Sequence, residues 1–356
     1  MVFTYKEIDK HIDSLNDRFP FYNWLIPVNL NTELKRFKRN PLSYNPDFIY
    51  KYTNRGLDEA EKILSNIDPA PGAAKDLYIA LKEEYYNKIE LIRRIGKPLA
   101  FTEMSLSIFG WMDEADKQFS EDVLDTYSDD NYLENIPAED IKNGLETMVA
   151  EKGIVGWQVI LDDRIASKVT VKPTERTIYV RSDVDFFPSE LERLKVHEVA
   201  VHLFRAANGE KQPYAIFKNG LAGYLEAEEG LAVYYENKMK VCNQQQMKIY
   251  AGRYKAVEQA LYKSFAEVFR ELKNWFPDEM ALRLTFRAKR GMTDTSQPGA
   301  LTKDIHYISG YKKVKKLMID RTMANVFFCG KTGLNHIEKI SRMLSDKLLR
   351  EPKYKP

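Results

Sequence analysis

The sequence contains little cysteine: Cys242 and Cys329 are the two thiols in 356 residues. Two thiols so far apart in sequence cannot form a disulfide framework, and they are too few for a cysteine-rich zinc ribbon. Scarce cysteine is typical of proteins from a reducing compartment. Any metal that the protein binds must therefore be held by nitrogen and oxygen ligands.

Long apolar runs and a strong excess of one charge are also absent. No stretch approaches the roughly 18 continuous apolar residues of a membrane span, and the opening MVFTYKEIDKHIDSL lacks the apolar segment of a signal peptide. Lys and Arg number 54 against 52 for Asp and Glu, so no uniform field favours nucleic acid or an anionic membrane. We expect a cytoplasmic protein without nucleic-acid or membrane partners, and the oligomeric state stays unknown.

Helical periodicity dominates the chain from Tyr5 to about Ile154. Examples are LDEAEKILSNI from Leu57 and KDLYIALKEEYYNKIELIRRI from Lys75, with proline and glycine between such segments. We predict an all-helical N-terminal region over residues 1–154 and a second region over residues 155–356, packed as one continuous unit.

The period changes between residues 157 and 187. The segments WQVIL, ASKVTV and TIYVR are short and β-branched, and KPTER between the last two is a turn signal. They predict a small sheet that ends in a hairpin, with residues 166–171 as an edge strand that could bind an extended peptide. The expected fold class is α+β, predominantly α-helical.

Three helices are expected to follow the hairpin. The first has Ser189 as its N-cap and ends at Asn208 and Gly209. The second starts near Leu225, and the third is a long tyrosine-rich helix over residues 244–275.

The first of these helices contains the hexapeptide HEVAVH, from His197 to His202, which holds two of the five histidines. In a regular helix, residues four apart lie about 40° from each other around the axis, but residues five apart lie about 140° apart. Both imidazoles could face one ion only if a π-bulge accommodates an extra residue, a rare feature that tends to occur at functional sites. The spacing predicts such a distortion.

A third ligand is available on the next helix, where Glu226, Glu228 and Glu229 occur. Two histidines and a glutamate are a standard set for catalytic zinc, with the fourth position open to water. We favour Glu229, because Gly230 beside it would let the two helices approach closely. Glu198 is the natural general base for a water on the ion. The alternative is that these histidines and acids are ordinary packed or solvated helix residues.

Three blocks of the chain, HEVAVHLFRAANG, AEEGLAVYYE and LTKDIHYISG, resemble the microtubule-associated tyrosine carboxypeptidase family. The resemblance implies a zinc metallopeptidase of gluzincin type that binds one zinc ion. It also implies His197 and His202 as ligands, Glu198 as the catalytic acid/base and a glutamate of EEGLA as the third ligand. Bacterial relatives often have Gln at the position of Glu228, which again favours Glu229, and they tend to have Thr where this chain has Val201.

A carboxypeptidase must hold a terminal carboxylate, for which guanidinium groups are well suited. The residues that could bind the substrate in this way are Arg205, Arg287, Lys289, Arg290 and, from the third block, Lys303. Tyr307 could donate to the oxyanion, with His306 as an alternative donor. Glu236 could orient a histidine, or be a plain surface acid.

We therefore expect a zinc-dependent carboxypeptidase whose substrate is a peptide or protein C-terminus. Two other functions stay open. The zinc hydrolase could act on another amide, or the chain could be a helical interaction protein with a structural or vestigial metal site.

Overall fold

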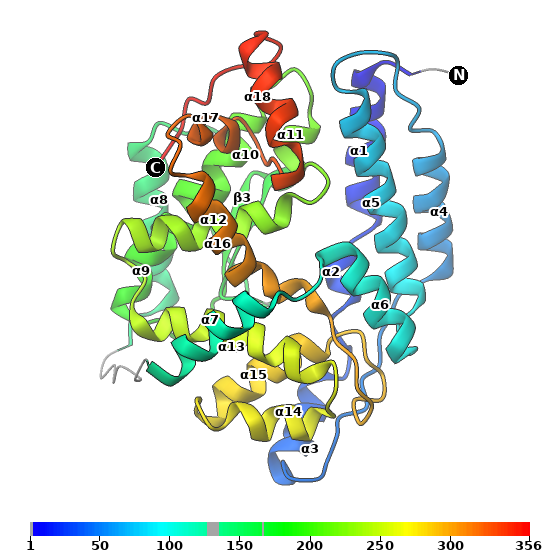
Figure 1. Ribbon diagram of the computed structural model, residues 1–356, viewed down its shortest axis with the longest axis vertical. Coiled ribbons are helices and arrows are strands. Elements are labelled where there is room, and N and C mark those ends of the chain that lie inside the picture. Colours follow the sequence, from blue (N-terminus) through cyan, green and yellow to red (C-terminus); the bar gives the residue numbers. More distant parts are fainter. Residues whose placement is uncertain (1–2, 127–134, 166) are drawn as a thin grey trace. The chain divides into compact units, whose positions relative to one another are not determined.

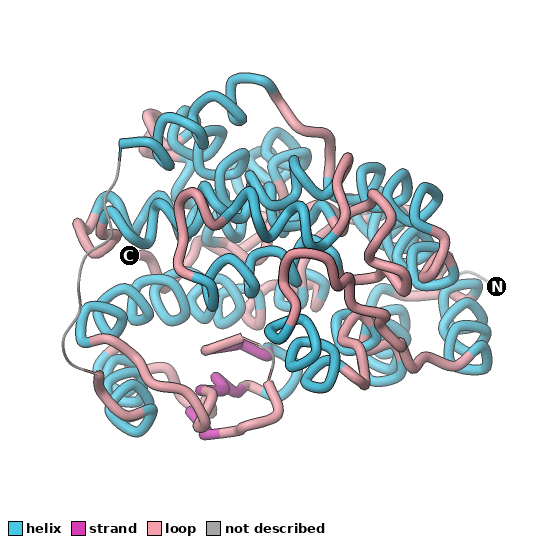
Figure 2. Tube along the Cα trace, turned by 90° about the horizontal axis from the view of Figure 1, so that it is seen from below, coloured by secondary structure: helices cyan, strands magenta, loops and turns pink. Residues whose placement is uncertain are grey.

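The computed structural model describes residues 3–126, 135–165 and 167–356. Most of them are helical, and they form one sheet of three short strands (Figures 1 and 2). The prediction of an α+β, predominantly α-helical fold is confirmed. None of the helices in the described ranges has both the length and the apolar character that crossing a bilayer requires.

The chain forms two compact units, each assembled from segments that are distant in sequence. The first unit contains, among the described residues, 3–71, 75–126 and 246–309; the second unit contains 72–74, 135–165, 167–245 and 310–356. The two compact units are defined by contacts between residues, whereas the predicted division into 1–154 and 155–356 is based on sequence periodicity. That division stays a prediction.

The first unit is helical. Its helices are α1 (Tyr5–Arg18), α2 (Phe21–Trp24), α3 (Leu30–Arg39), α4 (Asn54–Ser65), α5 (Lys75–Arg93), α6 (Pro98–Phe109), α7 (Glu114–Thr126), α13 (Gln244–Ala260), α14 (Phe265–Leu272), α15 (Asp278–Lys289) and the 3-10 turn η3 (Thr302–Ile305).

The predicted helical periods around residues 57 and 75 are confirmed as α4 and α5. On α4 the residues Leu57, Ala60 and Leu64 follow the spacing of one helix face, and all three are fully buried. Helix α1 packs against α4, α4 against α5, and α5 against α6 (Figure 1). Burial of such leucines stabilises the unit by roughly 1.5–3 kcal/mol for each side chain.

The expected long helix over residues 244–275 is wrong in one respect, because it is two helices. Helix α13 ends at Ala260, and α14 begins after Ser264. The Ser264 hydroxyl accepts from the Glu267 backbone N–H, and the Glu267 carboxylate accepts from the Ser264 backbone N–H. This capping box starts a new helix, and it outweighs the continuous helical propensity of the sequence.

The second unit contains the sheet and the motif helix. Its elements are α8 (Ala138–Glu151), β1 (Gln158–Leu161), β2 (Val169–Lys172), η1 (Pro173–Glu175), β3 (Thr177–Val180), α9 (Pro188–Leu194), η2 (Lys195–Leu203), α10 (Phe204–Gly209), α11 (Ile216–Asn219), α12 (Tyr224–Lys238), α17 (Met323–Phe328), η4 (Leu334–His336) and α18 (Ile337–Ser345). Helix α16 (His306–Leu317) begins in the first unit and ends in the second, and the first two residues of α13, Gln244 and Gln245, belong to the second unit.

The sheet has the strand order β1-β3-β2, and Figure 2 shows its strands close together. Strands β2 and β3 form the predicted antiparallel hairpin, with Val169 opposite Val180, while β1 pairs with β3 in parallel. The expected edge strand is thus confirmed as β2, although Ala166, its expected first residue, lies outside the described residues. Helix α8 packs on β1, and both α8 and β2 contact η2.

The motif helix begins two residues earlier than expected, at Pro188 instead of Glu190. Pro188 is the first residue of α9, so Ser189 lies inside the helix and is not its N-cap. A proline fits the first helical position because the missing N–H has no partner there in any helix. The Glu190 carboxylate accepts from the Phe187 backbone N–H at 2.9 Å and so caps the turn.

Candidate metal centre

The segment η2 is wound as a π-helix over nine residues, Lys195–Leu203. At its end the backbone N–H of Phe204 donates to the carbonyl of Val199, five residues earlier. This wider winding brings residues five apart to the same side of the helix. The predicted distortion is confirmed, and it is longer than the single turn expected.

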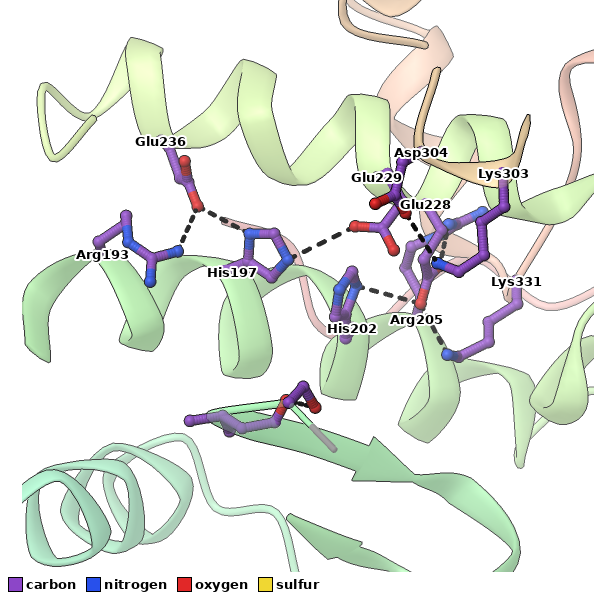
Figure 3. Close-up of polar contacts among 12 residues, drawn as sticks. Arg193, His197, His202, Arg205, Glu228, Glu229, Glu236, Lys303, Asp304 and Lys331 are labelled. Carbon is purple, nitrogen blue, oxygen red and sulfur yellow. Dashed lines mark hydrogen bonds and ion pairs between the residues drawn. The ribbon is translucent and has the colours of Figure 1, made fainter. Parts of the chain in front are cut away.

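The winding brings the two histidines together. The ring centroids of His197 and His202 lie 4.6 Å apart, with the ring planes at 82°. On α12, which packs along η2, Glu229 places a carboxylate oxygen 3.7 Å from Nε2 of His197 (Figure 3). One donor atom from each of the three residues lies within 4.8 Å of the other two, and no more than 12% of any of the three side chains is exposed.

The close approach at Gly230 differs from the one expected. A Cβ on Gly230 would lie 2.3 Å from the carbonyl carbon of Gly310, on α16. A Cβ on Gly310 would lie 2.1 Å from the carbonyl oxygen of Glu226. The paired glycines therefore let α12 cross α16 closely, and they are not a spacing device between α12 and the motif helix.

Glu236 lies behind His197, on the side away from Glu229. Its Oε1 is 2.7 Å from Nδ1 of His197, and Arg193 contacts the same oxygen at 3.2 Å (Figure 3). A carboxylate at Nδ1 favours the tautomer with a proton there and leaves the Nε2 lone pair for a metal. Burial opposes a charge on His197, but hydrogen bonds to Glu229 and Glu236 outweigh it and raise the pKa of His197 to about 10.

Glu228 lies beside Nδ1 of His202, a position that the sequence did not predict. Its Oε1 is 3.1 Å from Nδ1 of His202 and 2.6 Å from Nζ of Lys331, and its Oε2 contacts the guanidinium of Arg205 (Figure 3). Burial opposes the charge of this carboxylate, but the charges of Lys331 and Arg205 hold the pKa of Glu228 well below its usual range. No local pattern identifies Lys331, which is 103 residues from Glu228.

Arg205 is fully buried, which contradicts an exposed role in substrate binding. Besides Glu228, its guanidinium donates to the backbone carbonyls of Phe327 and Gly330, at 3.0 and 3.2 Å, and of Thr332, at 2.6 Å. Arg205 is three residues after His202, and this spacing places the two side chains on the same side of the helix, as expected. The sequence alone could not show that the C-terminal segment covers that side. The structure favours a supporting role for Arg205.

Glu198 is buried next to His197, with 7% of its surface exposed. Its charge is among those that raise the pKa of His197. Its assignment as general base stays a prediction.

The other residues expected to bind substrate lie in the first unit, where three of them gather around Asp304. Arg287 donates to both oxygens of Asp304, at 2.5 and 2.8 Å, and Nζ of Lys303 lies 3.9 Å from Oδ1. Burial opposes the charge of Asp304, but Arg287 and Lys303 hold its pKa well below the usual range. The guanidinium of Arg290 donates to the backbone carbonyl of Arg287 at 3.3 Å, and its buried Nη2 has no hydrogen-bond partner among the described residues.

Two further residues of the first unit have defined surroundings. The ring of Tyr307 stacks on Tyr250, at 5.1 Å between centroids, and the guanidinium of Arg253 lies 4.1 Å from the ring centroid. Lys289 donates to the backbone carbonyls of Lys263 and Gln297, so its ammonium group is engaged by the fold. The role of Tyr307 in catalysis stays a prediction.

The donor set of the cluster fits a zinc ion. Two imidazole nitrogens and one carboxylate oxygen are a common set in catalytic zinc sites, and the same donors also suit manganese, iron and cobalt. The carboxylates behind the imidazoles are the partners that metal-binding histidines usually have. The cluster has three donors in the part of the chain that the structure describes.

Comparison with known proteins supports the resemblance seen in the sequence. The profile of the family described as "Microtubule-associated tyrosine carboxypeptidase" matches residues 35–356, and the chain belongs to this family. Microtubule-associated tyrosine carboxypeptidase 1 of Mus musculus is 24% identical over 297 residues, which cover 82% of this chain and 55% of that protein. The putative tyrosine carboxypeptidase MATCAP2 of Mus musculus is 22% identical over 339 residues, which cover 92% of this chain and 57% of that protein. The chain thus spans about half the length of these relatives.

Proposed function

We propose that this protein is a zinc-dependent metallopeptidase of gluzincin type that removes residues from the C-terminus of a peptide or protein. The observation that carries the proposal is the cluster of His197, His202 and Glu229, whose donor atoms lie within 4.8 Å of one another on two helices that pack together. Membership in a family whose relatives are named tyrosine carboxypeptidases supports the choice of reaction.

The three ligands would leave a position on the ion for water or substrate, as in catalytic zinc sites. When bound, zinc would polarise the scissile carbonyl and lower the pKa of a water molecule. Glu198 would take the proton from that water and pass it to the leaving amine nitrogen. Glu198 follows His197 directly in the chain and is buried, which supports this role.

Among the cations of the first unit, Arg290 is the one we propose for a terminal carboxylate. Asp304 already accepts from Nε and Nη2 of Arg287, whereas Nη2 of Arg290 is buried without a hydrogen-bond partner in the described part of the chain. Burial and the nearby Arg287 lower the pKa of Arg290, so an anion would relieve an unfavourable charge. Lys303 stays a second candidate.

The test uses purified protein, zinc and a set of peptides that differ in the last residue. Mass spectrometry should detect products shortened by one residue. Glu198→Gln should bind zinc as the wild type does and cleave about 10²–10⁴ times more slowly, because it lacks the group that moves the proton. Arg290→Met should raise KM for peptides with a free carboxylate and have less effect on amidated ones.

The outcomes separate this proposal from its alternatives. If wild-type protein binds zinc but cleaves no peptide, the carboxypeptidase assignment is lost. Products cut at an internal amide would favour a hydrolase of another amide. A metal that neither exchanges nor supports any hydrolysis would favour a structural site in an interaction protein.

A further inference from the structure

The two histidines of the cluster have matching surroundings on the side away from Glu229. His197 has a carboxylate at Nδ1, that of Glu236, and this carboxylate contacts Arg193. His202 has the carboxylate of Glu228 3.1 Å from Nδ1, an ion-pair distance whose geometry is not that of a hydrogen bond, and this carboxylate contacts two cations. Each imidazole thus has a carboxylate behind it, and each carboxylate has a cation behind it.

The position of Glu228 is determined by contacts on both of its oxygens. Lys331 holds Oε1 at 2.6 Å and Arg205 contacts Oε2, and both cations are buried. A carboxylate held by two cations stays ionised and cannot turn toward the ion without leaving two buried charges uncompensated. Adjacent residues on a helix differ by about 100° in direction, so Glu228 and Glu229 reach different sides of His202.

The cations are themselves fixed by the C-terminal segment of the chain. The backbone N–H of Lys331 donates to the Phe217 carbonyl at 2.7 Å, and the Lys331 carbonyl accepts from the Leu221 N–H at 2.9 Å. Arg205 is fixed by three backbone carbonyls between Phe327 and Thr332. The segment 327–332 therefore sets the position of both cations around one carboxylate.

We propose that Glu228 is a positioning residue for His202. The negative charge of its carboxylate, 3.1 Å from Nδ1 of His202, favours a proton on that nitrogen and leaves Nε2 for the ion, while Lys331 and Arg205 hold that carboxylate in place. This inference rests on the proposed metal site, but it concerns the affinity for the ion and the tautomer of the ligand rather than the reaction. The inference also means that segment 327–332, which is distant in sequence from the histidine motif, contributes to metal binding by fixing the two cations.

The test measures zinc affinity by competition with a chelator, together with the absorption spectrum of the cobalt-substituted protein. Glu228→Gln removes the charge and keeps the size of the side chain, and we expect a zinc Kd about 10–100 times higher and a changed cobalt spectrum. Lys331→Met should have a smaller effect in the same direction, and Lys331→Arg should restore most of the affinity. Lys313→Met is the matched control, because Lys313 pairs with Glu226 on the exposed side of α12.

A second measurement uses only the wild-type chain, in case Glu228→Gln does not fold. With five histidines, the ¹⁵N-histidine spectrum of the zinc-loaded protein is simple. The proposal expects a protonated Nδ1 and a metal-bound Nε2 for both histidines whose signals respond to zinc. A protonated Nε2 on His202, or unchanged zinc affinity in folded Glu228→Gln, overturns it. Peptide cleavage is scored separately, so a protein that binds zinc without cleaving peptides would refute the proposed function and leave this inference intact.

Discussion

His197 and His202 are five residues apart in sequence, yet their ring centroids lie 4.6 Å apart because the nine residues of η2 are wound as a π-helix. A regular α-helix would point these imidazoles to different sides. The unusual winding is thus the condition for the proposed metal site, because it brings the two imidazoles into one donor cluster.

Replacing either histidine should abolish the metal site. For His202→Ala we expect zinc content to fall from about one ion per chain to near zero, because two donors cannot hold zinc in competition with a chelator. Elemental analysis of dialysed protein measures this. His11→Ala is the control, since His11 lies on α1 beside Phe3 and outside the cluster. Full zinc occupancy in His202→Ala would contradict the assignment.

Glu236 should tune the affinity for the ion without binding it. Its oxygen lies 2.7 Å from Nδ1 of His197, so Glu236→Gln removes the charge that fixes this tautomer. We expect the zinc Kd to rise about 10–100-fold, measured by chelator competition. Glu226→Gln, also on α12, is the control and should leave the Kd unchanged, because Glu226 pairs with Lys313 instead.

The glycine pair at the crossing of α12 and α16 should be intolerant of side chains. A Cβ on Gly230 would meet the backbone of Gly310 at 2.3 Å, and a backbone cannot move aside as a side chain can. We expect Gly230→Ala to lower the free energy of unfolding by about 1–3 kcal/mol, even after the helix-propensity gain of about 1 kcal/mol. Urea unfolding measures the change.

The matched control for this substitution is Gly144→Ala, on α8. Its Cβ would meet only the end of the Leu191 side chain, at 2.5 Å, which can rotate away. We expect a change near zero, because the propensity gain of about 1 kcal/mol offsets the small shift. Equal losses in the two variants would show that the close backbone crossing does not limit residue 230.

Asp304 should contribute stability that depends on pH. Its carboxylate is buried and bound by Arg287, and its folded pKa lies below the unfolded value of about 3.9. A depressed pKa contributes stability that is present above about pH 4 and is lost as the pH falls toward the folded value. At pH 7, Asp304→Asn should cost about 3–5 kcal/mol, because Arg287 loses its buried partner.

The measurement is urea unfolding of both proteins at several pH values. Below pH 4 the wild type should lose stability faster than Asp304→Asn, so the difference between them shrinks. Asp58→Asn is the control, since the Asp58 side chain is exposed and its carboxylate pairs with Arg93 at 3.3 Å. A difference between wild type and Asp304→Asn that stays constant from pH 7 to pH 2 would rule out this linkage.

The sequence by itself determined the fold class, the hairpin, the family and the distortion between His197 and His202. These features are local: a helical period, a turn between two β-branched segments, and a spacing of five are all visible within a few residues. The break between α13 and α14 was also encoded locally, in the capping box of Ser264 and Glu267, but the continuous helical pattern concealed it.

Only the tertiary structure decided which charges meet. It brought Lys331 to Glu228 and covered Arg205 with the carbonyls of residues 327–332, so a residue expected to bind substrate became buried support. Of the three acids on α12, Glu229 is the one that the structure places in the donor cluster, and Gly230 contacts α16. Such contacts join segments about a hundred residues apart, and their energies depend on burial, which no local pattern of residues contains.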